Sequence, residues 1–216
     1  MKIMILGANG FTGRRIIKRL APNHQVMACS LHPDILPEEG YQFQTLNMVD
    51  ADTTDSLLKD FQPEVIINAS ALSVVDYCEQ HPEEAYALNV SAVKHLAEYS
   101  QANSCRLIHL STDFVFDGTA SEAYKETDSP TPVNYYGKTK RWSEEAIEQT
   151  CTNYAIARVE VVYGKPFPGQ HGNIVHLVKS RLENGQGIRV VSDQFRSPTW
   201  VEDIARAIES LQSEKH

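Results

Sequence analysis

Short apolar runs alternate with amphipathic stretches along most of the chain. A strand buried on both faces of a parallel sheet gives a continuous apolar run, whereas a covering helix gives apolar positions every three or four residues. The strands predicted in this way cover residues 3–6, 26–30, 41–46, 65–68, 107–110 and 154–158. The helices predicted between them cover residues 14–20, 55–61, 83–100 and 136–150. This alternation is typical of an α/β, doubly wound Rossmann domain with a parallel sheet.

A change in composition divides the chain after Gly164. The residues from Lys165 to Gly172 include two prolines and two glycines and predict a loop. We therefore expect a dinucleotide-binding domain over residues 1–164 and a small, incomplete C-terminal substrate-binding region over residues 165–216. Within the second region the pattern predicts a helix over 173–184, a strand over 188–191 and a helix over 201–211.

Charge and composition narrow the class of function. Twenty Lys and Arg against 28 Asp and Glu give a formal net charge of -8, so we expect no surface for nucleic acid or for an anionic membrane. The N-terminal apolar run is too short for a signal peptide, and no stretch is typical of a membrane span. The four cysteines are widely spaced, and the histidines show no metalloprotease spacing. These features predict a cytoplasmic protein that acts on a small molecule; they identify no metal ligands and leave metal dependence open.

Three glycines follow the first predicted strand at the spacing Gly-x-x-Gly-x-x-Gly. A pyrophosphate can sit on a helix N-terminus only where no side chain blocks its approach to the backbone. The spacing differs from Gly-x-Gly-x-x-Gly and is typical of short-chain dehydrogenases; a plain tight turn is the alternative. The residues that we expect to bind a nicotinamide cofactor here are Gly7, Asn9, Gly10, Phe11, Thr12 and Gly13.

The end of the second strand bears on the choice between NADPH and NADH. A carboxylate about 20 residues after the glycine motif binds the ribose hydroxyls in NAD-dependent enzymes. No carboxylate stands at this strand tip, and Asp34 lies beyond a proline. Ser30, His32 and the basic Arg14 and Arg15 could instead accept a 2′-phosphate. We therefore expect a preference for NADPH, with NADH as the other candidate.

The fourth strand is followed by small residues that would let a cofactor cross the edge of the sheet. These residues are Ala69, Ser70 and Ala71, and close helix packing is the alternative explanation. In the next helix Asn89 falls among apolar positions, where a buried amide must find partners. We expect Asn89 to bond to backbone near the site and to support cofactor binding; an ordinary buried cap is the alternative.

A tyrosine and a lysine stand four residues apart, so they share one helix face. They are Tyr136 and Lys140, in a helix whose predicted N-cap is Asn134. The preceding strand delivers the hydroxyls of Ser111 and Thr112 to the edge where open parallel sheets bind ligands. A surface pair is the alternative explanation for the tyrosine and the lysine.

The chemistry of a carbonyl reductase explains why such a pair is needed. A free tyrosine has a pKa near 10, so proton transfer at neutral pH calls for a lower value, which a neighbouring ammonium favours. In the reduction direction a hydride passes to the carbonyl carbon and Tyr136 protonates the developing alkoxide. Thr112 fixes the carbonyl oxygen, with Ser111 as the weaker candidate, while Lys140 also bonds the nicotinamide ribose.

The chain resembles the dTDP-4-dehydrorhamnose reductase family of extended short-chain dehydrogenases. The stretches that carry the resemblance are GANGFTG, VIINASALSVVDYCEQHPEEAYALNVSAVKHLAEYS, LIHLSTDFVFDG, PVNYYGKTK, VVYG and DQFRSPTWVEDIA. The resemblance implies a catalytic triad of Thr112, Tyr136 and Lys140 and reduction of the 4-keto group of a dTDP-linked 6-deoxy sugar with NADPH. It implies a nucleotide-sugar substrate, a homodimer as a candidate assembly, and substrate contacts from Ser111, Asp113 and Arg196.

Departures from the family pattern affect the expected ligand walls. Asn47, which we expect to bind the cofactor, stands where an Asp on the adenine side is common. Leu72 and Ser73 replace a Tyr-Thr pair, and Val161 replaces an aromatic residue. Family members also continue well past the Ser-Pro-Thr motif, so we expect a fragment with an intact cofactor half and a partly open substrate pocket. Two other classes stay open: a noncatalytic relative like the regulatory subunit of methionine adenosyltransferase, and an epimerase of another nucleotide sugar.

Overall fold

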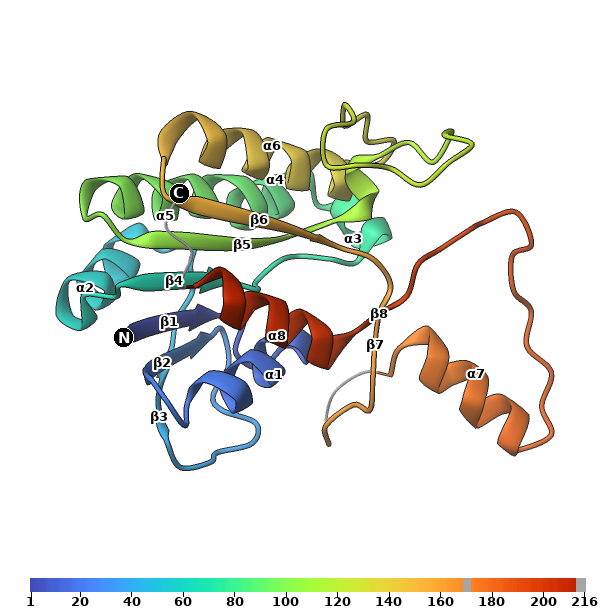
Figure 1. Cartoon of the computed structure of the whole chain (residues 1–216), viewed down its shortest axis with the longest axis horizontal. Coiled ribbons are helices and arrows are strands. Elements are labelled where there is room, and N and C mark those ends of the chain that lie inside the picture. Colours follow the sequence, from blue (N-terminus) through green and yellow to red (C-terminus); the bar gives the residue numbers. More distant parts are fainter. Residues whose placement is uncertain (169–171, 213–216) are drawn as a thin grey trace.

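A six-stranded parallel sheet forms the centre of the computed structural model, which describes residues 1–168 and 172–212 (Figure 1). The strands are β1 (Lys2–Leu6), β2 (Gln25–Ser30), β3 (Tyr41–Thr45), β4 (Val65–Asn68), β5 (Arg106–Thr112) and β6 (Tyr154–Val159). Their order is β3-β2-β1-β4-β5-β6, and every neighbouring pair is parallel. The chain therefore has the doubly wound Rossmann fold that the apolar pattern predicts.

Helices cover both faces of this sheet. The α-helices of the described residues are α1 (Phe11–Leu20), α2 (Ala51–Phe61), α3 (Val75–Gln80), α4 (Pro82–Tyr86), α5 (Ala92–Ala102), α6 (Tyr135–Thr150), α7 (Ile174–Glu183) and α8 (Val201–Leu211). Of these, α7 has no buried residue and lies away from the sheet (Figure 1). Alternate residues of β1 show how the faces divide, because Met4 packs in one buried cluster with α2, α5 and α6, whereas Ile5 packs in another with α1 and α8. The central strand is thus buried on both sides, which explains its unbroken apolar run.

The region from 83 to 100 is helical as predicted, but with a π-helical turn, η1 (Ala87–Ser91), between α4 and α5. One extra residue in a turn shifts the face that the following side chains present, and such turns are frequent at functional sites. Asn89 lies within η1 and is fully buried. The short helix α3, which the apolar pattern did not predict, precedes this run.

The predicted strand over residues 188–191 is wrong. Val190 and Val191 are exposed and lie in a loop, because no neighbouring strand among the described residues offers them hydrogen-bond partners. The pairing in this region instead joins β7 (Val162–Tyr163) to β8 (Thr199–Trp200) as two short parallel strands. Through this small sheet, the chain that follows α7 pairs with the segment that leaves β6 (Figure 1).

The helix α8 packs on α1, although it lies beyond the expected domain boundary. Ile204, Ala205 and Ile208 are buried in the cluster that contains α1 and one face of the sheet. The boundary at residue 164 stays a prediction, but α8 contributes to the core of the first region. Within the described residues, none of the helices combines the length and apolar character that crossing a membrane requires.

We predict that Ile208→Ala lowers the free energy of unfolding by about 2–5 kcal/mol, because it leaves a cavity between α8 and α1. Arg206→Ala on the exposed face of the same helix is the matched control and should cost about 1 kcal/mol or less. Urea unfolding followed by far-ultraviolet circular dichroism measures both. Equal effects of the two substitutions would show that α8 is not part of the cooperative core.

Candidate active site

The glycine turn after β1 lies against the chain that follows β4. Gly7 has a φ of +81°, and a Cβ there would lie 2.7 Å from backbone atoms of Ala69 and Ser70. A Cβ on Gly13 would overlap the Gly7 carbonyl oxygen. Only residues without side chains permit this approach, and a cofactor phosphate has the same requirement. The turn is therefore more than a loose connection between β1 and α1.

The N-terminus of α1 is open to an anion. Gly10 occupies the N-cap position, and no side chain there bonds to the first N–H groups of the helix. Phe11, Thr12 and Asn9 are partly buried around the same turn. Exposed N–H groups at a helix N-terminus, together with the helix dipole, favour a bound phosphate.

A cavity of about 560 Å³ lies beside this turn at the carboxyl ends of β1, β2 and β4. Five residues that we expected to bind cofactor line it: Gly7, Ser30, Asn47, Ser70 and Ala71. The remaining wall is largely apolar and includes the side chains of Leu31, Met48, Val49 and Leu88. An open parallel sheet binds its ligands at this edge, so the cavity has the position and size for the adenosine part of a dinucleotide.

Arg14 and Arg15 are not available for a 2′-phosphate, and that expectation is corrected. Arg14 is buried, forms an ion pair with Asp34 and bonds to Tyr41 through Nη1 at 2.7 Å. Arg15 is also buried and pairs with Glu202 at 3.0 Å. Both guanidiniums therefore hold the fold together around α1.

Asp34 and His32 lie in the loop after β2. Burial alone would raise the pKa of the Asp34 carboxyl, but hydrogen bonds from Tyr41 and Arg14 hold it below its usual range. His32 has an exposed side chain outside the cavity lining, and its backbone carbonyl accepts a hydrogen bond from Asn9 Nδ2 at 3.0 Å. Asn9 therefore connects the glycine turn to this loop.

Tyr136 and Thr112 meet where α6 crosses the carboxyl end of β5. Tyr136 is 9% exposed, and its ring packs edge-on against Phe114 with 5.7 Å between the centroids. Burial raises the pKa of Tyr136 to about 12, and a hydrogen bond with the Thr112 side chain acts in the opposite direction. The phenol is consequently protonated at neutral pH, the state that a proton donor requires. Neither residue lines the 560 Å³ cavity.

Lys140 lies one turn further along α6 and is 1% exposed. Its Nζ is 2.9 Å from Nε2 of His109 and donates to the Leu110 carbonyl oxygen at 2.8 Å. Burial lowers the pKa of Lys140 to about 7, although the nearby Glu144 carboxylate favours the charged form. The expected lowering of the Tyr136 pKa by this lysine is wrong for the structure, because burial dominates at both groups and the amine contacts β5 instead.

The expected substrate-binding residues Asp113 and Arg196 are brought together from distant parts of the chain by an ion pair. The Arg196 guanidinium also lies over the Phe114 ring, 5.0 Å from its centroid. This pair stands next to Thr112, so it borders the place where a carbonyl substrate would meet Tyr136. Ser111 is buried close to Glu144. Burial would raise the pKa of the Glu144 carboxyl, but Arg158 and the Ser111 hydroxyl stabilise the carboxylate and hold that pKa below its usual range.

Asn89 bonds to backbone near the site, as expected. Its Oδ1 accepts from the Leu72 N–H at 2.9 Å, and its Nδ2 donates to the Leu72 carbonyl at 2.9 Å and to Thr139 Oγ1 at 3.0 Å. Because both amide hydrogens are used within the protein, Asn89 supports the site by joining the chain after β4 to α6. A direct contact with the cofactor stays a prediction.

Three residues with a part in the site were missed in the sequence. Gly137 lets α6 approach η2 (Asp113–Val115), because a Cβ there would overlap the Phe114 carbonyl oxygen. His109 is fully buried beside Lys140, and Glu144 is fully buried on α6, where it pairs with Arg158 of β6 and with Arg141. A polar residue on a buried strand and an acidic residue four positions after Lys140 were the signals available.

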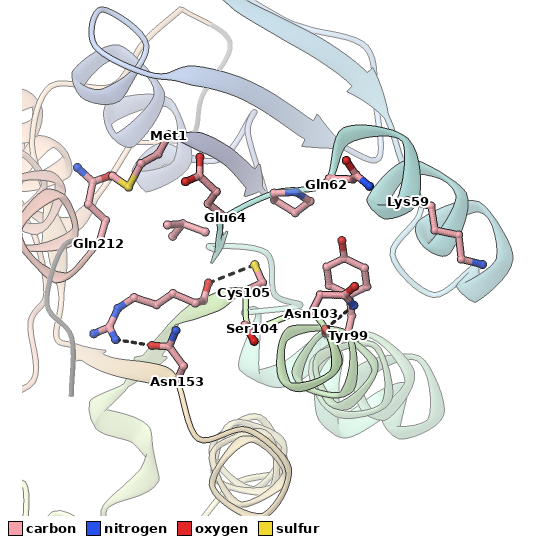
Figure 2. Close-up of a pocket in the computed structure, with 13 residues that line it drawn as sticks. Met1, Lys59, Gln62, Glu64, Tyr99, Asn103, Ser104, Cys105, Asn153 and Gln212 are labelled. Atoms are coloured by element: carbon pink, nitrogen blue, oxygen red, sulfur yellow. Dashed lines mark hydrogen bonds between the residues drawn. The ribbon is translucent and has the colours of Figure 1, made fainter.

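A second hollow, of about 780 Å³, opens at the opposite edge of the sheet, at the amino ends of β4 and β5 (Figure 2). Lys59, Glu64, Tyr99 and Asn153 are among the residues around it, and none of the expected site residues is. Parallel sheets bind ligands at their carboxyl edge, so we do not assign the active site here despite the larger volume. In the part of the chain that the structure describes, no group of His, Cys, Asp and Glu could hold a metal ion.

Comparison with known proteins agrees with this geometry. The chain is 34% identical over 210 residues to dTDP-4-dehydrorhamnose reductase of Aggregatibacter actinomycetemcomitans. The matched segment covers 96% of this chain and 66% of that protein. It is 31% identical over 211 residues to methionine adenosyltransferase 2 subunit beta of Bos taurus, covering 97% and 61% respectively. The chain thus spans less than two thirds of the length of these two curated relatives.

The fold of the chain also matches that of a solved structure. The crystal structure of dTDP-4-dehydrorhamnose reductase from Bacillus anthracis in complex with NADP superposes with a TM-score of 0.83 at 28% identity, covering 99% of this chain and 71% of that one. Residues 1–216 also match the family described as RmlD substrate binding domain over the full sequence. The chain therefore belongs to the RmlD substrate-binding family of NAD(P)-dependent oxidoreductases.

Proposed function

We propose that this protein is an NAD(P)H-dependent reductase of a nucleotide-linked 4-keto-6-deoxy sugar, with dTDP-4-dehydrorhamnose as the favoured substrate. The observation that carries the proposal is the arrangement along one sheet edge. A glycine cradle and an adenosine-sized cavity occupy β1, β2 and β4, and a buried Thr112–Tyr136 pair stands at the end of β5. A dinucleotide lying across this edge would bring its nicotinamide towards the pair.

The residues of the cradle fit such a cofactor. Side chains at Gly7 and Gly13 would collide with backbone atoms of this turn and of the chain after β4, so the close turn that a pyrophosphate site requires could not form. The first turn of α1 supplies uncapped N–H groups. When bound, the dihydronicotinamide supplies the hydride for the carbonyl carbon. The roles of the protein are to bind, to orient the carbonyl and to deliver the proton.

Tyr136 is the proton donor in this proposal. Its pKa of about 12 keeps the proton on the phenol until negative charge develops on the substrate oxygen. Thr112 would hold that oxygen through its hydroxyl. In the structure this hydroxyl accepts a hydrogen bond from the Phe114 N–H at 3.2 Å and donates to Asp113 Oδ1 at 3.0 Å, so its hydrogen must turn from Asp113 to the substrate. The low exposure of Tyr136 restricts water, so the charge on the alkoxide is quenched by the phenol.

NADPH remains the preferred cofactor in the proposal, although Arg14 and Arg15 no longer support that preference. Ser30 lines the cavity at the tip of β2, and the nearby Asp34 carboxylate is occupied by Arg14 and Tyr41. A ribose phosphate would therefore meet a hydroxyl and no unpaired carboxylate at this strand tip. The solved relative from Bacillus anthracis holds NADP. A cytoplasmic location and a homodimer stay predictions from the sequence.

A noncatalytic regulatory subunit is the second candidate. The similarity to methionine adenosyltransferase 2 subunit beta is close to that of the named reductase. The ion pair of Asp113 with Arg196 also favours this candidate. The two side chains expected to hold a substrate are bound to each other instead. Cofactor binding without turnover, together with a stable complex with a larger enzyme, would favour this candidate.

We predict that Tyr136→Phe lowers kcat for reduction by about 100-fold or more, because the proton donor is removed, while the Kd for NADPH changes less than about threefold. Tyr135→Phe is the matched control, since Tyr135 packs on Trp142 on the same helix and keeps the donor intact. NADPH oxidation with dTDP-4-keto-6-deoxy-L-hexose measures turnover, and chiral analysis of the sugar separates reduction from epimerisation. Near wild-type turnover by Tyr136→Phe would remove the phenol from the mechanism.

We predict that Gly13→Ala weakens NADPH binding at least tenfold, because the new Cβ pushes the start of α1 away from Gly7. Gly187→Ala is the control, since nothing lies within 4 Å of a Cβ at that glycine. Isothermal titration calorimetry on folded samples measures binding, and thermal unfolding reports any loss of structure. Unchanged NADPH affinity in Gly13→Ala would exclude the glycine turn as the phosphate cradle.

A further inference from the structure

Two parts of the lining of the 560 Å³ cavity favour different groups of a ligand. One part is Gly7, beside the open N-terminus of α1, where N–H groups favour an anion. The other part is formed by Tyr77 of α3 and Glu84 of α4. Among the described residues that line the cavity, Glu84 is the one charged side chain, and its charge is negative. A ligand with its phosphate on the glycine turn should therefore present a hydrogen-bond donor to Glu84.

The Glu84 side chain lies on the side of its helix that borders the cavity. Ala87 and Leu88, three and four residues later, line the same cavity, and side chains at these spacings share one helix face. The phenol of Tyr77 donates to Oε2 of Glu84 at 2.9 Å. His81 stacks on the Tyr77 ring with 3.9 Å between the centroids, which supports the ring from its other side. The carboxylate is thus restrained, although it is exposed to solvent.

One oxygen of this carboxylate is still available to a ligand. Oε2 accepts from Tyr77, whereas no described residue donates to Oε1 of Glu84. The amide oxygen of Asn47, which also lines the cavity, already accepts the Val49 N–H at 3.2 Å. A charged oxygen accepts a stronger hydrogen bond than an amide or a hydroxyl does. Oε1 of Glu84 is therefore the strongest open side-chain acceptor in the lining.

Adenine is the part of a dinucleotide that offers a matching donor. Its exocyclic amine carries N–H groups, whereas the ring nitrogens beside it only accept. The apolar side chains of Leu31, Met48 and Leu88 in the lining suit the faces of a flat heterocycle. With the pyrophosphate on the glycine turn, the base is the part of the cofactor left to fill this apolar space. An acceptor at its border then distinguishes an amine from a carbonyl oxygen on the base.

We propose that Glu84, held by Tyr77, selects adenine as the base of the bound cofactor by accepting a hydrogen bond from its exocyclic amine. This inference rests on the proposed cofactor-binding role of the cavity and adds the choice of base to it. Hypoxanthine has a carbonyl oxygen in place of the amine, and it must shift to use its ring N–H instead. Because Glu84 is open to water, we expect a preference of about tenfold, below the values of buried polar sites.

The test compares two cofactors that differ in this one group. Isothermal titration calorimetry on the whole chain measures the Kd for NADPH and for its analogue with hypoxanthine in place of adenine. We expect the native chain to bind the analogue about tenfold more weakly than NADPH. Glu84→Gln should lower this ratio below about threefold, because the glutamine amide can also donate to the hypoxanthine oxygen.

Glu83→Gln is the matched control. Glu83 and Glu84 are adjacent acids in the first turn of α4, so both substitutions remove one charge that favours the helix N-terminus. Glu83 does not line the cavity, and the ratio of the two Kd values should be unchanged in this variant. An equal fall in both variants would show that the helix or the net charge, and not a contact with the base, sets the preference.

Tyr77→Phe tests the positioning role of the phenol. The variant keeps the ring but releases the carboxylate, so the ratio should fall part of the way towards the Glu84→Gln value. In the Glu84→Gln background, loss of the Tyr77 hydroxyl should leave the ratio unchanged, because no carboxylate is left to hold. A further fall there would overturn the positioning role, since the phenol would then contact the base itself.

The inference and the proposed function fail in different ways. Equal affinity of the native chain for the two cofactors, or an unchanged ratio in Glu84→Gln, would overturn the selection of the base even in an active reductase. A folded chain that binds neither cofactor would overturn it as well, since the cavity would then hold no adenine. Base selection that depends on Glu84, in a chain that reduces no sugar, would support the inference and remove the reductase.

Discussion

The contact between α6 and the carboxyl half of β5 is the constraint on which the site depends. Gly137 removes the side chain that would keep α6 away from the chain after β5, and the Lys140 amine bonds to the Leu110 carbonyl across the same interface. Tyr136 is thereby buried beside Thr112. The same approach that places the phenol also removes water from the lysine, so the position of both groups and their proton affinities have one origin.

Buried polar groups in this interface are satisfied in a connected way. Asn89 joins the chain after β4 to Thr139, Asn68 joins that chain to His109, and Glu144 joins α6 to Arg158 on β6. Each bond offsets the cost of taking a polar group out of water, and a network of this kind admits few alternative arrangements. The end of β4, the end of β5 and the first turns of α6 therefore form one rigid unit, which is the support that a precisely aimed proton donor needs.

The two hollows described above lie at opposite edges of the sheet, and the direction of the strands indicates which of them suits a cofactor. The larger one lies at the amino ends of β4 and β5, whereas the smaller one lies at the carboxyl ends beside the glycine turn. At the carboxyl edge the N-terminus of α1 presents N–H groups to a ligand, and the backbone of Gly7 is accessible. Helix direction thus favours an anionic cofactor at the smaller hollow.

The sequence determined the six strands of the sheet, the main helices, the glycine turn and the shared face of Tyr136 and Lys140, because these follow from local periodicity and spacing. Tertiary structure decided which charges are free: Arg14 reads as a phosphate ligand in the sequence, yet a loop residue, Asp34, binds it. It also placed α8 in the core and put His109 beside Lys140. Proton affinity depends on burial and on neighbours from other elements, so the lowered pKa of Lys140 could be inferred only once the fold had buried it between β5 and α6.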